Sequence, residues 1–304
     1  MLSTGRQNQK TAKLNDSMES RYGYVLIAPL ILLIVVFIFF PAIYSFAISL
    51  FYYNPFGHQI HFAGISNYAE VLHSSLFALA VLNVMYYTAV VVTLQTILAF
   101  SLAMLFNYRF RITRMSRALV FIPAITSPVA LSIIFIWVFS RQGMVNYFLS
   151  MVGVQPINFF FSTTFAFPAI MAMNIFSTAP YFMVMYLAGL QAIPPHILEA
   201  ASLDGIRSGW KRFRYIYAPM LSFTTFLVVV LGVIGSMQLF DQVFVITGGG
   251  PANSTYVPLI YIYNRAFLYF GTLGVSSAAS FILFAVIMAV TLLQRRYLKE
   301  LRWA

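Results

Sequence analysis

Charged residues are scarce in this 304-residue chain, and cysteine is absent. Only 8% of the residues are charged and 61% are hydrophobic, with a mean hydropathy of +0.85. A water-soluble globule carries roughly 25% charged residues to cover its surface. Most of this surface must therefore face lipid or other apolar protein, which excludes a soluble enzyme, a nucleic-acid-binding domain and a disordered regulator. The lack of cysteine excludes disulfides, thiolate metal sites and a cysteine nucleophile.

Motifs for catalysis and nucleotide binding are also missing. The sequence contains neither His-Glu-x-x-His nor Gly-x-Ser-x-Gly, and none of its four lysines follows a glycine, as a phosphate-binding P-loop requires. His58 and His61 share a short segment, but no cysteine or carboxylate cluster joins them, so solvated histidines are favoured over a metal site. If transport consumes a nucleotide here, another polypeptide must bind it.

Long apolar runs dominate the sequence instead. A transmembrane helix needs about 20 mostly apolar residues to cross a hydrocarbon core of roughly 30 Å. Six runs are long enough, so the sequence predicts an all-α, polytopic membrane protein with six transmembrane helices. They cover residues 24–51, 76–106, 118–139, 166–190, 218–246 and 273–293.

The basic residues predict the orientation of these spans. Of the 18 lysines and arginines, all but Arg141 and Arg265 fall into four groups: before the first span, between the second and third, between the fourth and fifth, and after the sixth. Cytoplasmic loops retain positive charge, so both termini are predicted to be cytoplasmic. The net charge of +11 therefore indicates topology and contact with anionic lipid headgroups, not a nucleic-acid partner.

The acidic residues weigh against two other classes of membrane protein. Only seven exist, and Asp241 alone falls near a predicted span. A stand-alone proton- or sodium-driven carrier usually needs intramembrane carboxylates, so this alternative has little support. An intramembrane enzyme is disfavoured as well, because no nucleophile–base pair or metal cluster can be assembled inside the spans.

The segment between the fourth and fifth predicted spans, residues 191–217, carries the most informative pattern. Pro194 and Pro195 end one helix and can start another, because proline lacks only an N–H that a first helical turn does not need. The sequence predicts a short helix over residues 196–203. Gly205 follows at the position where a left-handed cap is needed.

This short helix has features of a docking element. Ile197, Ala200 and Ala201 share one face at helical spacing, and the small alanines allow another backbone to approach closely. Glu199 offers a charge to a basic partner. The pattern predicts a segment that projects into the cytoplasm; an ordinary connecting loop is the alternative.

The same segment resembles the EAA loop of binding-protein-dependent ABC importer permeases. The matching residues are Glu199-Ala200-Ala201, Asp204-Gly205, Trp210, Phe213, Ile216 and Pro219, whereas Ala218 replaces the usual leucine. In that family this helix seats in a groove of the ATPase subunit. The resemblance implies that Glu199, Ala200, Ala201, Asp204 and Gly205 couple this chain to an ATPase.

Further motifs resemble carbohydrate permeases of the maltose-transporter type. They are Phe240 to Pro251 with Thr255 and Tyr261-Ile262-Tyr263, Phe62 to Tyr68, Pro180-Tyr181, and Gly189 to Pro194. The resemblance implies a type I importer permease in a bacterial or archaeal cytoplasmic membrane. Its parts would be a cytoplasmic tail (1–21), a six-helix permease domain (22–294) containing the 191–217 loop, and a second cytoplasmic tail (295–304).

The resemblance also implies the partners. Such a permease works with a second homologous permease subunit, two ABC ATPase subunits and an extracytoplasmic solute-binding protein that delivers a sugar. ATP and magnesium bind to the ATPase subunits. This chain is therefore expected to have no catalytic residue, cofactor or metal site of its own, and no nucleic-acid partner.

Polar residues within the spans are candidates for the sugar path. Asn174 and Tyr181 are seven residues apart and project from similar faces of a helix. By resemblance, span-four positions aligned with these two hold sugar, although Phe176 replaces a usual tryptophan and leaves the particular solute open. The other candidates are Asn83, Gln95, Ser236, Gln238 and Asp241.

Each of these residues also has a structural interpretation. Polar side chains within a membrane often only join one helix to another, and Asp241 is better explained as a helix-end charge than as an ion site. The spans contain no arginine or lysine, which favours a neutral sugar over a glycerol-phosphate ester as cargo.

Overall fold

The computed structural model describes residues 26–54, 59–107, 111–269 and 272–300. The predicted tail at 1–21 and His58 lie outside the described residues. Within them, five helices are long and apolar enough to cross a membrane, and one bent helix pair makes a sixth candidate. The five are Leu26–Ser49, Ser75–Phe106, Ala166–Gln191, Ser222–Ile246 and Leu273–Arg296, which agree with five of the six predicted runs.

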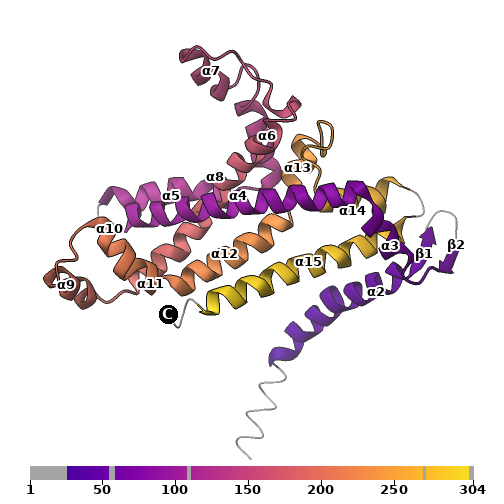
Figure 1. Ribbon diagram of the computed structural model, residues 1–304, viewed down its shortest axis with the longest axis horizontal. Coiled ribbons are helices and arrows are strands. Elements are labelled where there is room, and N and C mark those ends of the chain that lie inside the picture. Colours follow the sequence, from indigo (N-terminus) through magenta and orange to yellow (C-terminus); the bar gives the residue numbers. More distant parts are fainter. Residues whose placement is uncertain (1–25, 55–58, 108–110, 270–271, 301–304) are drawn as a thin grey trace, which may run out of the picture.

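The long helices form a bundle with opposite ends of different character (Figure 1). The first span contains η1 (Val35–Phe39) and α2 (Phe40–Ser49), and it leads to the outer end with β1 (Phe51–Asn54), β2 (Gln59–Phe62) and α3 (Ser66–His73). The next elements are α4 (Ser75–Phe106), α5 (Arg111–Ile125), α6 (Pro128–Val138), α7 (Met144–Met151), η2 (Phe159–Phe161) and α8 (Ala166–Gln191). The opposite end carries α9 (Pro195–Leu203), α10 (Gly209–Arg212), η3 (Phe213–Tyr217) and α11 (Ala218–Met220). The chain then forms α12 (Ser222–Met237), α13 (Asp241–Ile246), α14 (Pro258–Tyr263), η4 (Asn264–Leu268) and α15 (Leu273–Glu300).

The third predicted span differs from the expected single helix over 118–139. Two helices, Met115–Ile125 and Pro128–Val138, meet there at a bend of 100°. Thr126 and Ser127 form the break, and Pro128 opens the second helix without an N–H to continue the first. Hydropathy gives the length of an apolar run but not the direction of its helix axis, so residues 118–139 gave no sign of this bend.

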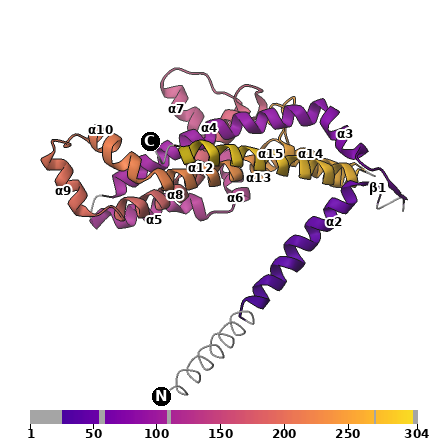
Figure 2. The same ribbon diagram turned by 60° about the horizontal axis from the view of Figure 1, so that its bottom comes forward.

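The predicted all-α membrane fold is confirmed, and one short β-hairpin is added to it outside the spans. After α2 the chain forms an antiparallel hairpin in which Phe51 pairs with Phe62 and Tyr52 with His61. The Tyr52 and His61 rings stack with centroids 4.7 Å apart. The hairpin extends beyond the outer end of the bundle, and in Figure 2 the helix that precedes it leans away from the other spans.

A compact junction ties this outer end together. The amide of Asn67 donates to the carbonyl oxygens of Ser49 (2.8 Å) and Phe51 (3.0 Å), and the Tyr68 hydroxyl lies 2.7 Å from that of Ser49. These contacts fasten α3 to the end of α2. Gly274 at the start of α15 packs against the Phe51 carbonyl oxygen and the Asn67 amide, which explains why no side chain fits there.

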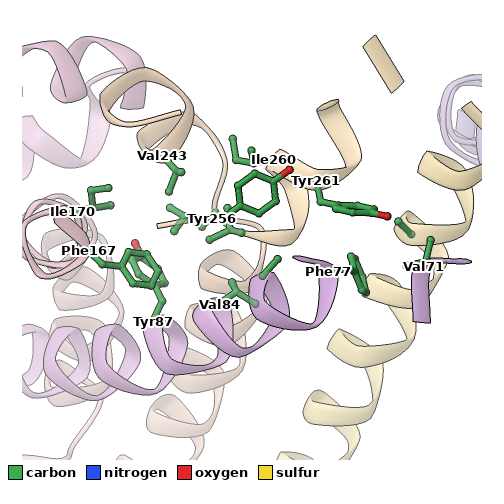
Figure 3. Close-up of a cluster of buried hydrophobic side chains, with 14 of the residues drawn as sticks. Val71, Phe77, Val84, Tyr87, Phe167, Ile170, Val243, Tyr256, Ile260 and Tyr261 are labelled. Carbon is green, nitrogen blue, oxygen red and sulfur yellow. The ribbon is translucent and has the colours of Figure 1, made fainter. Parts of the chain in front are cut away.

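Helix α4 is the centre of the bundle, because it packs along α8 and also contacts α12 and α14. Aromatic rings fill the outer half of the core (Figure 3). The rings of Tyr87 and Phe167 stack with centroids 5.4 Å apart, and Phe77 meets Tyr261 edge-on at 5.2 Å. This packing fixes α4, α8 and α14 relative to one another and positions the outer loop.

The junction at Gly274 predicts a sensitive position. A Cβ atom there would lie 2.1 Å from the Phe51 carbonyl oxygen, so Gly274→Ala should destabilise the protein by about 1–3 kcal/mol. Thermal unfolding of the detergent-purified chain should show a lower midpoint. Gly235→Ala in α12 is the matched control, because a Cβ atom there meets nothing within 4 Å. Equal midpoints for the two variants would contradict this account.

Candidate functional site

The short helix predicted over 196–203 is confirmed as α9, Pro195–Leu203. Pro194 is its N-cap residue in an extended conformation, and Pro195 occupies the first turn. Gly205 has φ +79°, the left-handed conformation that the sequence predicted. The amide of Ile206 reaches back to the Ala201 carbonyl oxygen at 2.8 Å and closes the helix end.

The exposed face of α9 agrees with the predicted docking face only at Ala200, which is exposed. Of the other two predicted residues, Ala201 is buried and Ile197 is partly buried against this chain's own core. The exposed face carries His196, Glu199, Ala200 and Leu203 at i, i+3, i+4 and i+7. Leu203 is 86% exposed.

Arginine side chains brace the loop that follows α9. The Arg212 guanidinium donates to the Ser202 hydroxyl (3.1 Å) and the Ile206 carbonyl oxygen (3.3 Å), and Arg207 donates to the Ser202 carbonyl oxygen (3.3 Å). From the sequence, these arginines were interpreted only as indicators of membrane topology. Their spacing from Ser202 matches no regular secondary structure, so their hydrogen bonds to this residue could not be predicted.

A series of contacting aromatic rings connects the 191–217 loop to the spans. The ring of Phe213 packs against Trp210 (5.4 Å) and Phe100 (5.3 Å), and Phe100 in turn meets Tyr186 of α8 (5.5 Å). The Tyr186 hydroxyl donates to Thr225 in α12 at 3.0 Å. The 191–217 loop is therefore in packed contact with α4, α8 and α12.

The candidate sugar-path residues divide into buried and exposed ones. Asn174 is buried on α8, where the Thr178 hydroxyl donates to its carbonyl oxygen (2.8 Å) and lies 2.7 Å from the Gln95 amide oxygen on α4. The Gln95 amide nitrogen faces Gly232 on α12, where a Cβ atom would lie only 2.5 Å from it. Gln95, Thr178 and Asn174 thus form a polar contact where three spans meet.

The remaining candidates do not all join this contact. Tyr181, seven residues along α8, is 52% exposed, and its ring meets Phe182 edge-on at 5.3 Å. Ser236 is buried within α12, whereas Gln238 and Asp241 are exposed around the break between α12 and α13. Asp241 lies in the first turn of α13, where a negative charge is favourable, in agreement with the helix-end interpretation.

The outer loop after α13 is tightly hydrogen-bonded. The Thr255 hydroxyl donates to the Gly250 carbonyl oxygen and lies 2.7 Å from the Thr247 hydroxyl. Asn83 of α4 anchors the same loop by donating to the carbonyl oxygens of Asn253 (3.2 Å) and Tyr256 (2.9 Å). Asn83 was a candidate for the sugar path, and its contacts give it a structural role.

The Tyr256 ring also packs into this loop. A Cβ atom at Gly249 would lie 2.6 Å from the ring, so only glycine fits there, and Asn264 donates to the phenol oxygen at 3.1 Å. Burial raises the pKa of the Tyr256 phenol above its ordinary value.

Arg265, the second basic residue predicted outside, is engaged within the chain. Its guanidinium forms an ion pair with Glu70 at 3.2 Å and lies over the rings of Tyr261 (5.3 Å) and Tyr269 (5.6 Å). Arg141, between α6 and α7, is exposed. In the part of the chain that the structure describes, no three histidine or acidic side chains gather into a metal-binding cluster.

Comparison with known proteins yields a consistent family. Residues 95–302 match the family described as binding-protein-dependent transport system inner membrane component. The trehalose/maltose transport system permease protein MalF of Thermococcus litoralis is 33% identical over 96% of this chain and 97% of its own length. The sn-glycerol-3-phosphate transport system permease protein UgpA of Agrobacterium fabrum is 32% identical over 91% and 94%.

A solved structure shares the fold. It is a bacterial alginate ABC transporter in complex with an alginate pentasaccharide-bound periplasmic protein, matched with a TM-score of 0.82 over 95% of this chain and 97% of that one. The sequence identity is 19%. Similarity at this level shows that the two chains share the fold.

The hydrogen bonds of the outer loop predict the effect of one isosteric change. Thr255→Val should destabilise the loop by about 1–3 kcal/mol, because it leaves the Gly250 carbonyl oxygen and the Thr247 hydroxyl without this partner. Hydrogen exchange over residues 247–256 should become faster. Ser254→Ala is the control, since the neighbouring hydroxyl has no hydrogen-bond partner among the described residues. Unchanged exchange in the valine variant would refute the role assigned to Thr255.

Proposed function

This chain belongs to the binding-protein-dependent transport system inner membrane components, and we propose that it is the sugar-translocating permease of an ATP-driven importer. It is a multi-pass inner membrane protein and the non-catalytic transmembrane part of such a transporter. The proposal extends to its cargo, to the residues that couple it to ATP hydrolysis and to its subunit partners. Those are a second homologous permease, two ATPase subunits and an extracytoplasmic binding protein.

The exposed face of α9 supports its role as the coupling helix. Leu203 offers an apolar contact, Glu199 a charge, and Ala200 a surface on which another backbone can rest. These three features together suit a contact with a protein partner that offers an apolar and a basic surface. We assign Glu199, Ala200, Asp204 and Gly205 to the contact with the ATPase, and Ala201 to fixing α9 against this chain's own core.

The packing behind α9 supports coupling by rigid movement. Arg212 holds the loop to α9, and the Phe213–Phe100–Tyr186 contacts join it to α4 and α8. A displacement of α9 is therefore transmitted to the spans instead of being absorbed within a flexible loop. Closure of the ATPase subunits would in this way change which side of the membrane the permease opens to.

The sugar assignment rests on α8. Tyr181 and Phe176 each present a half-exposed ring close in sequence to the polar Asn174 and Thr178. Aromatic faces suit the C–H surface of a sugar ring, and a few fixed polar groups suit its hydroxyls. Asn174, Tyr181, Ser236 and Gln238 are the proposed path, and Asp241 lies at its outer end.

A glycerol-phosphate ester is the second candidate cargo, because the similarity to UgpA extends over most of the chain. A phosphate would call for a cationic side chain on the path. None of the five path residues is basic, which favours the neutral sugar. A ligand screen on the cognate binding protein separates the two: maltose-like sugars should bind and glycerol 3-phosphate should not.

The bent third span supports a second permease subunit beside α6. With 15 residues, α5 rises about 22 Å, less than the roughly 30 Å hydrocarbon core, before the chain turns by 100°. The non-helical residues after α6 then lie at membrane depth, where such backbone is tolerated only against protein or a water-filled cavity. Trp137 on α6 is 79% exposed within this chain, and we expect a second permease subunit to pack against it.

The observation that carries the coupling proposal is the exposed position of Leu203 on a braced helix. Because the chain has no cysteine, Leu203→Cys introduces a unique thiol. In the purified transporter, this thiol should crosslink to the ATPase subunit, whereas a thiol at Ile197, which faces the bundle, should not. Labelling from outside the cell, or crosslinks equal at both positions, would overturn the proposal.

The positive φ of Gly205 yields a functional prediction. Valine at φ +79° costs roughly 1–2 kcal/mol or more, so Gly205→Val should displace the end of α9 although no neighbouring atom obstructs the side chain. Uptake in reconstituted vesicles should fall several-fold relative to ATP hydrolysis.

Gly209→Val in the same loop is the matched control. Its φ lies outside the left-handed region and a Cβ atom there meets nothing within 4 Å, so uptake should stay near the unaltered level. Normal coupling in the Gly205 variant would count against the proposed role of this helix end.

A further inference from the structure

A groove at the cytoplasmic end of the bundle takes no part in the proposed transport path. Its volume is about 1160 Å³, and it lies between α4, the η3–α12 segment and the end of α15. Figure 1 shows α12 between α4 and α15 at this end of the molecule. Its apolar lining includes Ile97, Phe100, Phe223 and Phe226.

The groove is positively charged. Arg214 and Arg295 both line it, together with Trp210. Among the described residues the one ion pair joins Arg265 to Glu70 at the opposite end of the molecule, so these two guanidiniums have no carboxylate partner there. A guanidinium binds phosphate through paired hydrogen bonds and is matched by an anionic group of that kind.

The charged residues and the apolar lining lie at different depths. Arg214 precedes the fifth span and Arg295 lies near the end of the sixth, so both belong at the level of the cytoplasmic headgroups. Ile97 is nine residues before the end of α4, or about 14 Å further into the membrane. Tryptophan beside the charges is typical of the membrane interface.

We propose that this groove binds one anionic glycerophospholipid of the cytoplasmic leaflet. Its phosphate contacts Arg214 and Arg295, and an acyl chain lies along Ile97, Phe100 and Phe223. Basic pockets between membrane helices on the cytoplasmic side are suited to such headgroups. Because Arg214 belongs to η3, the bound lipid stabilises the end of the 191–217 loop that leads into the fifth span.

Native mass spectrometry of the full chain in detergent tests this proposal. Palmitoyl-oleoyl phosphatidylglycerol should remain bound as one tightly held molecule, and phosphatidylcholine with the same chains should not. The double variant Arg214→Gln/Arg295→Gln should weaken phosphatidylglycerol binding by about thirty-fold, since each cation near an anionic headgroup contributes roughly a five-fold effect.

The control removes the same charge nearby. Lys211 and Arg296 are exposed and lie outside the groove, so Lys211→Gln/Arg296→Gln should leave the tightly held lipid in place. An equal loss in both double variants would show diffuse electrostatic attraction and overturn the proposal. Thermal unfolding in lipid-free detergent checks that both double variants fold.

Two further experiments test whether something other than a lipid fills the groove. Inorganic phosphate at millimolar concentration should not displace the lipid, because it lacks the acyl chain; displacement would mean that the apolar lining is irrelevant. In the assembled transporter, phosphatidylglycerol with a photoreactive acyl chain should crosslink to residues 213–226. Labelling of other parts of the transporter without labelling of that segment would show that the lipid does not occupy the groove, which would refute the proposal.

Discussion

Hydrocarbon offers the peptide backbone no hydrogen-bonding partner, and the architecture follows from this constraint. With 61% hydrophobic and 8% charged residues, the chain can satisfy its backbone only as long helices that bond internally. The elements that depart from long helices, such as the β1–β2 hairpin and the loop around α9, lie at the two ends of the bundle (Figure 1). The bent third span is the exception, and it is the place where we propose that a second permease subunit packs.

Lipid does not drive helices together as water does, so close packing depends on small residues and a few polar contacts. Gly232 lets α12 approach Gln95 of α4, and Gly274 lets α15 reach the end of α2. The hydroxyl of Thr178 then links α8 to α4 through Gln95. These contacts join spans that the aromatic core also packs.

The candidate site could be read from the sequence in part. The two prolines and Gly205 act through local backbone geometry, so the position of α9 and the left-handed residue after it were predictable. Which face of α9 is free was not, because Ile197 and Ala201 find their partners among distant residues of α8, η3 and α12. The same limit applies to Asn83, whose partners are 170 and 173 residues away. The limit also holds for residues close in sequence. The hydrogen bond from Arg212 to Ser202 depends on the conformation of the loop between them, which no periodic pattern in the sequence predicts.

Composition and the order of residues alone determined that this is a multi-pass membrane protein, because hydropathy acts locally and adds along the chain. They also determined the ends of most spans and the position of the short helix α9. The tertiary structure decided the 100° bend, the exposed face of α9 and the gathering of Arg214 and Arg295 in one groove. Each of these depends on the direction of helices relative to one another, and direction is set by contacts between residues far apart in the sequence.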